Sequence, residues 1–170
     1  MTCRRRTIPT IAVGALAAIL VATPTRGARA DSGAPPESPK VGDVFPVFDA
    51  TGIDGTTRQV SYAKGSTTVL LFFLSGCPVC HRMIPEWNRA YDSRAKGLQV
   101  IGVLMDQEPP GFFTATPISF PVVRSPGIDF LRAQKVNRAP LTLRIGPGGI
   151  VKDVGVGQLD LIRLGEIFAP

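Results

Sequence analysis

Residues 67–87 read TTVLLFFLSGCPVCHRMIPEW, and this stretch decides the fold. Its first part, residues 67–74, is an uncharged run of β-branched, aliphatic and aromatic side chains, which is typical of a strand buried on both faces of a sheet. After that run the apolar spacing becomes helical, with Val79, Met83 and Trp87 four residues apart. The stretch therefore predicts a buried strand that leads directly into an amphipathic helix.

The segments on either side extend this pair into an α/β domain. Residues 98–105 form a second apolar run, which completes a βαβ unit with parallel strands. The sequence also predicts strands over 44–48, 58–62, 120–123, 141–145 and 150–154, helices over 127–134 and 159–168, and only a short helix within 107–119. The expected fold class is α/β, a central mixed β-sheet flanked by helices, with an N-terminal β-hairpin extension.

The first 42 residues have the composition of an export signal followed by a linker. Residues 1–30 carry three arginines at positions 4–6, continue through an apolar run over 11–21, and end on Ala28-Arg29-Ala30, a small-x-small cleavage pattern. We expect a signal peptide cleaved after Ala30; the alternative is an uncleaved membrane anchor over residues 8–23. Residues 31–42 are rich in Pro, Gly and Ser and predict a linker, so the folded domain is expected over 43–170, in the periplasm or cell envelope.

The charge distribution argues against nucleic-acid binding. The chain has a formal net charge of +6, but five of its arginines lie in residues 1–30, where there is no acidic residue. From Asp31 onward, 14 basic residues face 13 acidic ones. The mature domain is therefore almost neutral and lacks the basic, aromatic-rich stripe that nucleic-acid binding needs.

The cysteines indicate redox chemistry. Of the three, Cys3 lies in the predicted signal, and Cys77 and Cys80 stand in a Cys-Pro-Val-Cys motif at the predicted start of the helix. The helix dipole and the unpaired amides at this position stabilise a thiolate, which is the nucleophilic form of cysteine. We expect Cys77 to attack and Cys80, one turn further on, to resolve the resulting mixed disulfide. The two would form a redox disulfide.

Three blocks of sequence carry a family resemblance: residues 67–85, residues 100–105, and residues 136–142 followed by 148–151. In these blocks, and over about residues 41–168, the chain resembles the thioredoxin-like oxidoreductases of the bacterial envelope, the TlpA and ResA type. The resemblance implies a thioredoxin-like fold that exchanges disulfides with exported proteins, among them apocytochromes c, and with an electron-donating or electron-accepting redox partner. The chain departs from the family at Gly76, where Trp is frequent, and at Leu141, where Thr is frequent.

The resemblance also implies further site residues. The proline matching Pro140 follows a cis bond in that family, which leaves the backbone of the preceding residue, here Ala139, free to pair with a substrate strand. Leu71 occupies the position of the buried aspartate of thioredoxin, so a proton acceptor is expected in the family's alternative location after the second strand. There we predict Glu108 first and Asp106 second as the acid/base residue.

Other functions fit the same motif less well. Cys-Pro-Val-Cys-His also matches a haem c attachment pattern, but His81 is the only histidine, and Met83 is too near it in sequence to bind the opposite face of the iron. A peroxiredoxin would need Thr or Ser three residues before Cys77, where Leu74 stands. Copper or zinc delivery would lack a distant fourth ligand. We therefore expect neither a cofactor nor a metal.

Overall fold

The computed structural model describes residues 38–169. The predicted signal peptide, its cleavage site and most of the predicted linker lie outside the described residues. The elements are β1 (Phe48–Gly52), β2 (Thr57–Val60), β3 (Thr67–Phe73), α1 (Pro78–Asp92), β4 (Leu98–Leu104), α2 (Phe112–Ala115), β5 (Val122–Arg124), α3 (Ile128–Ala133), β6 (Leu141–Ile145), a 3-10 turn (Pro147–Gly149), β7 (Val151–Val156) and α4 (Leu161–Phe168). Between residues 38 and 169, none of the helices has the length and apolar character needed to cross a membrane.

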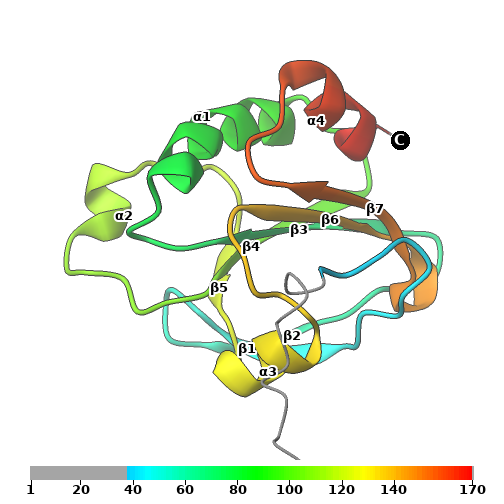
Figure 1. Ribbon diagram of the computed structural model, residues 1–170, viewed down its shortest axis with the longest axis horizontal. Coiled ribbons are helices and arrows are strands. Elements are labelled where there is room, and N and C mark those ends of the chain that lie inside the picture. Colours follow the sequence, from blue (N-terminus) through cyan, green and yellow to red (C-terminus); the bar gives the residue numbers. More distant parts are fainter. Residues whose placement is uncertain (1–37, 170) are drawn as a thin grey trace, which may run out of the picture. The chain divides into compact units, whose positions relative to one another are not determined.

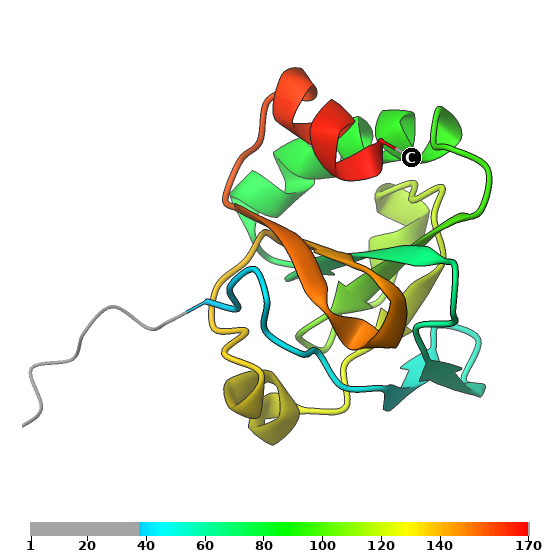
Figure 2. The same cartoon turned by 90° about the vertical axis from the view of Figure 1, so that its right-hand side faces the viewer.

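The strands form one mixed sheet in the order β2-β1-β5-β4-β3-β6-β7. Strand β3 lies parallel to β4, which in turn lies parallel to β5, while β6, β7 and the β1–β2 hairpin join antiparallel. Helices α1 and α4 cover one face of the sheet, and α3 covers the other (Figures 1 and 2). The predicted α/β class, the βαβ unit and the N-terminal hairpin are confirmed.

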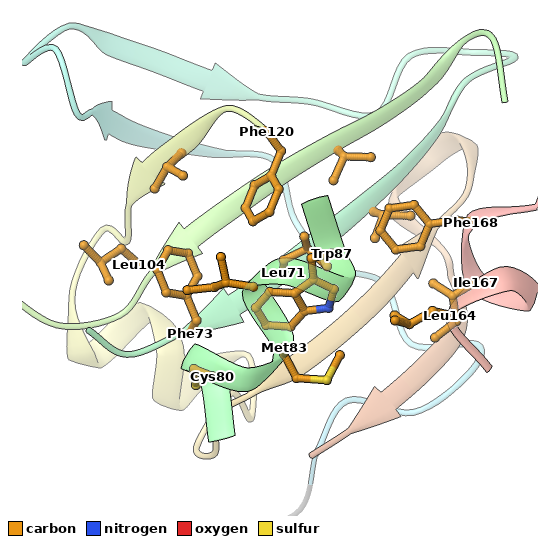
Figure 3. Close-up of a cluster of buried hydrophobic side chains, with 14 of the residues drawn as sticks. Leu71, Phe73, Cys80, Met83, Trp87, Leu104, Phe120, Leu164, Ile167 and Phe168 are labelled. Carbon is orange, nitrogen blue, oxygen red and sulfur yellow. The ribbon is translucent and has the colours of Figure 1, made fainter. Parts of the chain in front are cut away.

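Strand β3 separates two apolar cores because its side chains alternate between the faces of the sheet. Leu71 and Phe73 point into the cluster beneath α1 and α4, which also holds Cys80 and Trp87 (Figure 3). Phe72 belongs to the cluster on the opposite face. All five of these side chains are completely buried. The alternation explains why the sequence of this strand carries no polar position except near its start.

The first strand of the hairpin lies further along the chain than predicted. Residues 44–47 are not part of a strand: β1 begins only at Phe48, and Val44 makes a single isolated bridge to Ile150. Pro46 interrupts this segment because it has no N–H for a sheet hydrogen bond. Val44 and Val47 are also 66% and 51% exposed. The alternation of apolar residues there thus reflects an extended segment, not a strand.

The segment before the hairpin lies against the turn that precedes β7. Gly42 donates its backbone N–H to the carbonyl of Val151 at 2.9 Å. Phe45 donates its backbone N–H to the carbonyl of Gly149 at 2.7 Å. Gly149 has a positive φ of 82°, and a Cβ added there would meet the Phe45 carbonyl oxygen at 2.4 Å. The close backbone approach therefore requires glycine at this position.

We expect Gly149→Ala to destabilise the domain by about 2–4 kcal/mol, since the left-handed conformation and the collision with backbone add together. Gly148→Ala is the matched control, because Gly148 has a φ of 72° but open space around its Cβ position. The Gly148→Ala variant should lose only about 1 kcal/mol of unfolding free energy. Urea unfolding of both variants measures the difference, and equal losses would contradict the predicted collision.

Candidate active site

Cys77 lies at the start of α1, where β3 ends. It is the N-cap residue, in an extended conformation, and its Sγ accepts the N–H of Cys80 at 3.2 Å. Pro78 occupies the first helical position, where a missing N–H does no harm. The side chain of Cys77 is half-buried and is a free thiol. The sulfur therefore lies at the helix N-terminus with a backbone N–H directed at it.

Cys80 lies one turn further along α1 and has no exposed surface. It packs in the cluster that contains Phe73 and Met83 (Figure 3). Burial, together with the hydrogen bond and charge of the Cys77 sulfur, raises the pKa of the Cys80 thiol to about 12. The two cysteines therefore differ sharply in access to solvent, as their predicted roles require.

This difference predicts selective alkylation of the reduced protein. Between pH 7 and 9, iodoacetamide should modify Cys77 at least about tenfold faster than Cys80, because the Cys80 thiol is both inaccessible and protonated below about pH 12. Peptide mass spectrometry after short exposures separates the two sites from each other and from Cys3. The unfolded protein in urea is the control, in which both rates should converge. Equal rates in the folded protein would contradict the assignment.

The loop before β6 places Ala139 and Pro140 beside Cys77. The Ala139–Pro140 peptide bond is cis, as predicted. The Cys77 thiol points to the Ala139 carbonyl at 3.9 Å, across 62 residues of sequence. The antiparallel register of β3 and β6, which pairs Phe72 with Leu141, brings this loop to the end of β3. Ala139 is partly exposed, and Pro140 is buried.

The two acids after β4 have different neighbours. Glu108 pairs with Arg124 of β5, whose Nε donates to Oε2 at 3.2 Å, and this hydrogen bond holds the pKa of the Glu108 carboxyl below its usual value. Asp106 instead faces the turn before Cys77, where its carboxylate accepts the N–H and the hydroxyl of Ser75, both at 2.9 Å. Asp106 is thus the acid that contacts the segment carrying the cysteines.

His81 is also tied to Ser75. Its Nε2 lies 2.6 Å from the Ser75 carbonyl oxygen, and its ring packs edge-on against Phe112 of α2. Covalent haem attachment would need both cysteine sulfurs at the surface, and Cys80 has none of its surface exposed. Among residues 38–169, no three His, Cys, Asp or Glu side chains are grouped as a metal site requires. The geometry disfavours a haem site at this motif.

The two best-formed hollows of the described surface lie away from Cys77. Hollows of about 400 and 350 Å³ lie along α1 and α4 and along β4, and Cys77 lines neither of them. Gly76, next to the attacking sulfur, has open space around its Cβ position.

Comparison with known proteins agrees with this geometry. A model of the Redoxin family matches residues 40–161. The chain belongs to the Redoxin family. It is a thiol-disulfide oxidoreductase of the ResA and DsbE type, with Cys77 and Cys80 as its CxxC pair.

The individual similarities are distant. The thiol-disulfide oxidoreductase ResA of Oceanobacillus iheyensis is 26% identical over 133 residues, covering 74% of this chain and 69% of the relative. A Chlorobium tepidum protein assigned as the thiol:disulfide interchange protein DsbE is 28% identical, with a TM-score of 0.64 over 76% of this chain and 96% of that one. StoA of Bacillus subtilis, at 22% identity and a TM-score of 0.62, covers 72% of this chain and 96% of its own, and shares the fold.

The site of this oxidoreductase contains one feature that the sequence did not predict. Ser75 is almost fully buried and binds both Asp106 and His81, so these three residues form one hydrogen-bonded group beside Cys77. The only sequence signal was a polar residue directly after an apolar strand. Its partners could not be read from spacing, since Asp106 lies 31 residues away.

Proposed function

We propose that this oxidoreductase works outside the cytoplasm and exchanges disulfides with exported proteins, with Cys77 attacking and Cys80 resolving. The observation that carries the proposal is the contrast between the two sulfurs. Cys77 is partly exposed and faces the Ala139 carbonyl, whereas Cys80 is fully buried beneath it. Residues 1–30, with the composition of a secretory signal, support the location.

In the first step the Cys77 thiolate attacks one sulfur of a substrate disulfide. A bond forms between Cys77 Sγ and that sulfur, the substrate S–S bond breaks, and the second substrate sulfur leaves as a thiolate that takes a proton from water. Partial exposure lets the substrate reach Cys77. The N–H of Cys80, which points at the attacking sulfur, stabilises its negative charge before the attack.

In the second step Cys80 attacks the mixed disulfide. The Cys80 sulfur bonds to Cys77 Sγ, the bond to the substrate breaks, and the substrate leaves as a thiol with both its sulfurs reduced. The hydrogen bond and charge of Cys77 contribute to the raised pKa of Cys80. Both contributions disappear when Cys77 becomes part of the mixed disulfide. Attack by Cys77 therefore activates Cys80, although burial still favours its thiol form.

Cys80 must lose a proton to attack, and two acids are candidates for the acceptor. Glu108, the first candidate from sequence, is bound to Arg124, and a carboxylate with a lowered pKa is a weaker base. Asp106 binds Ser75, next to Leu74, whose backbone contacts the Cys80 sulfur. We therefore favour Asp106, reached through one water, as the acceptor.

The backbone of Ala139 is the proposed contact for the substrate chain. It is partly exposed and lies within 3.9 Å of the attacking sulfur, so a substrate strand paired with it would present its own cysteine to Cys77. Pro140 fixes this loop against β7, because its carbonyl accepts the N–H of Gly157 at 2.8 Å. The substrate would then be recognised through main-chain hydrogen bonds. Recognition of this kind accepts substrates of many different sequences.

The proposal is tested by equilibrating the purified chain, with Cys3→Ser to remove the third thiol, against glutathione buffers. We expect one intramolecular disulfide, a single transition between about −270 and −120 mV, and no Soret absorbance. A value near −270 mV assigns a reductant of exported proteins, and one near −120 mV a donor of disulfides. Cys77→Ser is the control and should show no transition. A covalently held haem or the absence of a disulfide would contradict the proposal.

A further inference from the structure

Strand β4 is paired along only part of one of its edges. On the first edge it pairs with β3 over its whole length, but on the second edge β5 pairs only with Gly102–Leu104. Before β5 the chain runs along α1 instead, where Ser119 donates its N–H to the Asn88 side chain at 2.9 Å. In the described sheet, no strand therefore lies beside residues 98–101 on the second edge.

This open edge of β4 presents backbone hydrogen-bonding groups. Gly102 donates its N–H to the Pro121 carbonyl at 2.8 Å, so the backbone groups of Gly102 face β5. Backbone groups of alternate residues in a strand point the same way, and those of Val100 therefore face the same side, where β5 has no residue to pair with them. A ligand in this position can bond to the main chain as well as to side chains.

The open edge borders the hollow along β4, which has a volume of about 350 Å³. Its apolar lining comes from both cores: Leu98 and Val100 belong to the cluster beneath α1, and Val60 and Val123 belong to the cluster on the opposite face. These four residues are at most 7% exposed, so packing fixes their positions. The volume lies at the lower end of the range of small-molecule sites, about 300–1,000 Å³.

The polar residues of the hollow are donors and cations. Arg58 and Arg94 both line it, and none of the acidic side chains between residues 38 and 169 does. Gln59 and Gln99 line it as well. The Gln99 Oε1 atom accepts the hydroxyl of Thr68 at 3.2 Å, which leaves the amide N–H groups of Gln99 as donors. A hollow lined by charges of one sign attracts the opposite charge, here an anion.

The two arginines differ in how far their charge is already paired. Arg58 forms an ion pair with Asp54 at 2.5 Å. The guanidinium carbon of Arg94 lies 3.7 Å from the centroid of the Tyr91 ring, and its Nη1 donates to the Tyr91 carbonyl at 2.7 Å. Within residues 38–169 both of these interactions are with Tyr91, so the Arg94 guanidinium is held in place while Nη2 keeps its N–H groups for a ligand. Arg94 is thus the cation that a bound anion would meet.

We propose that the hollow along β4 binds a small organic acid with an apolar body. Its carboxylate bonds to Arg94, because the guanidinium fork matches carboxylate geometry. Its apolar part covers the side chains that line the hollow from the two cores, which an inorganic anion would leave uncovered. Cys77 does not line this hollow, so the inference is independent of the proposed function.

The probe is octanoate, titrated to about 3 mM into the full chain and followed by NMR of the backbone amides. We expect the amides of Val100 and Arg94 to shift, with a dissociation constant of about 1 mM or lower. Octanol has the apolar body without the charge, and acetate has the charge without the body. Each should bind at least about tenfold more weakly than octanoate. Octanol binding as tightly as octanoate, or octanoate shifting neither amide, would overturn the inference.

Substitutions at two arginines locate the charge that holds the carboxylate. Arg94→Gln should weaken octanoate binding about tenfold or more, and Arg94→Lys, which keeps the charge but loses the fork, should weaken it less. Arg89→Gln is the matched control, since Arg89 belongs to α1, pairs with Glu86 and does not line this hollow. Its dissociation constant for octanoate should equal that of wild type. Unchanged binding in Arg94→Gln, or equal weakening in Arg89→Gln, would overturn the proposed site.

Discussion

Cys80→Ser is expected to accumulate a mixed disulfide between Cys77 and its substrate, whereas Cys77→Ser should trap nothing and lose disulfide exchange by about three orders of magnitude or more. The reason is geometric. Cys77 is partly exposed and faces the Ala139 carbonyl, so attack proceeds without Cys80. Resolution cannot proceed, because no second sulfur lies beneath the mixed disulfide. Non-reducing gels and mass spectrometry of the trapped species measure the first effect, and insulin reduction the second.

The two variants are matched controls for each other, since each replaces one sulfur of the CxxC pair by oxygen, Cys77 at the N-cap of α1 and Cys80 one turn further on. A Cys3→Ser background removes the third thiol from both. Trapping through Cys80, or equal loss without trapping in both variants, would contradict the assigned roles. Such a result would mean that the buried sulfur reaches substrate, which its lack of exposed surface opposes.

Trp87→Ala is expected to destabilise the domain by about 3–5 kcal/mol, a large part of the stability of an ordinary domain. The Trp87 side chain is completely buried on α1, with its ring centroid 6.4 Å from those of Phe73 and Phe120 (Figure 3). Truncation leaves a cavity between the helix and the sheet that surrounding side chains can fill only partly. The corresponding fall in Tm is about 10–20 °C. Urea unfolding and thermal melts measure the change.

Trp87→Phe is the control for this prediction. The Trp87 Nε1–H has no hydrogen-bond partner among the described residues, so its burial already costs free energy. Phenylalanine keeps an aromatic ring against Phe73 and removes that unpaired donor, and it should lose less than half as much stability as alanine. A loss below about 1 kcal/mol for Trp87→Ala, or equal losses for both variants, would mean that α1 does not depend on this contact.

Local sequence alone determined the central strand, the helix after it and the redox motif. An uncharged β-branched and aromatic run, followed by helical spacing, leaves few alternatives for residues 67–92. The position of Cys77 at the helix start depends only on Pro78 and on the few residues around it. Such features are readable because the hydrogen bonds of a helix, and the alternation of a strand, connect residues close in sequence. The family resemblance added the cis bond before Pro140, which the structure confirms.

Tertiary structure decided the features that depend on how distant segments meet. The hairpin begins at Phe48 rather than Val44, because Pro46 interrupts the sheet bonding that alternation suggested. Glu108 and Asp106 lie two residues apart in one loop, yet one binds Arg124 and the other Ser75. Which carboxylate faces the cysteines depends on the path of the loop that follows β4, and that path is set by contacts with segments distant in sequence. Sequence therefore predicted Cys77 as the nucleophile, and only the packing of β3, β4 and α1 brought Asp106 and His81 together at Ser75.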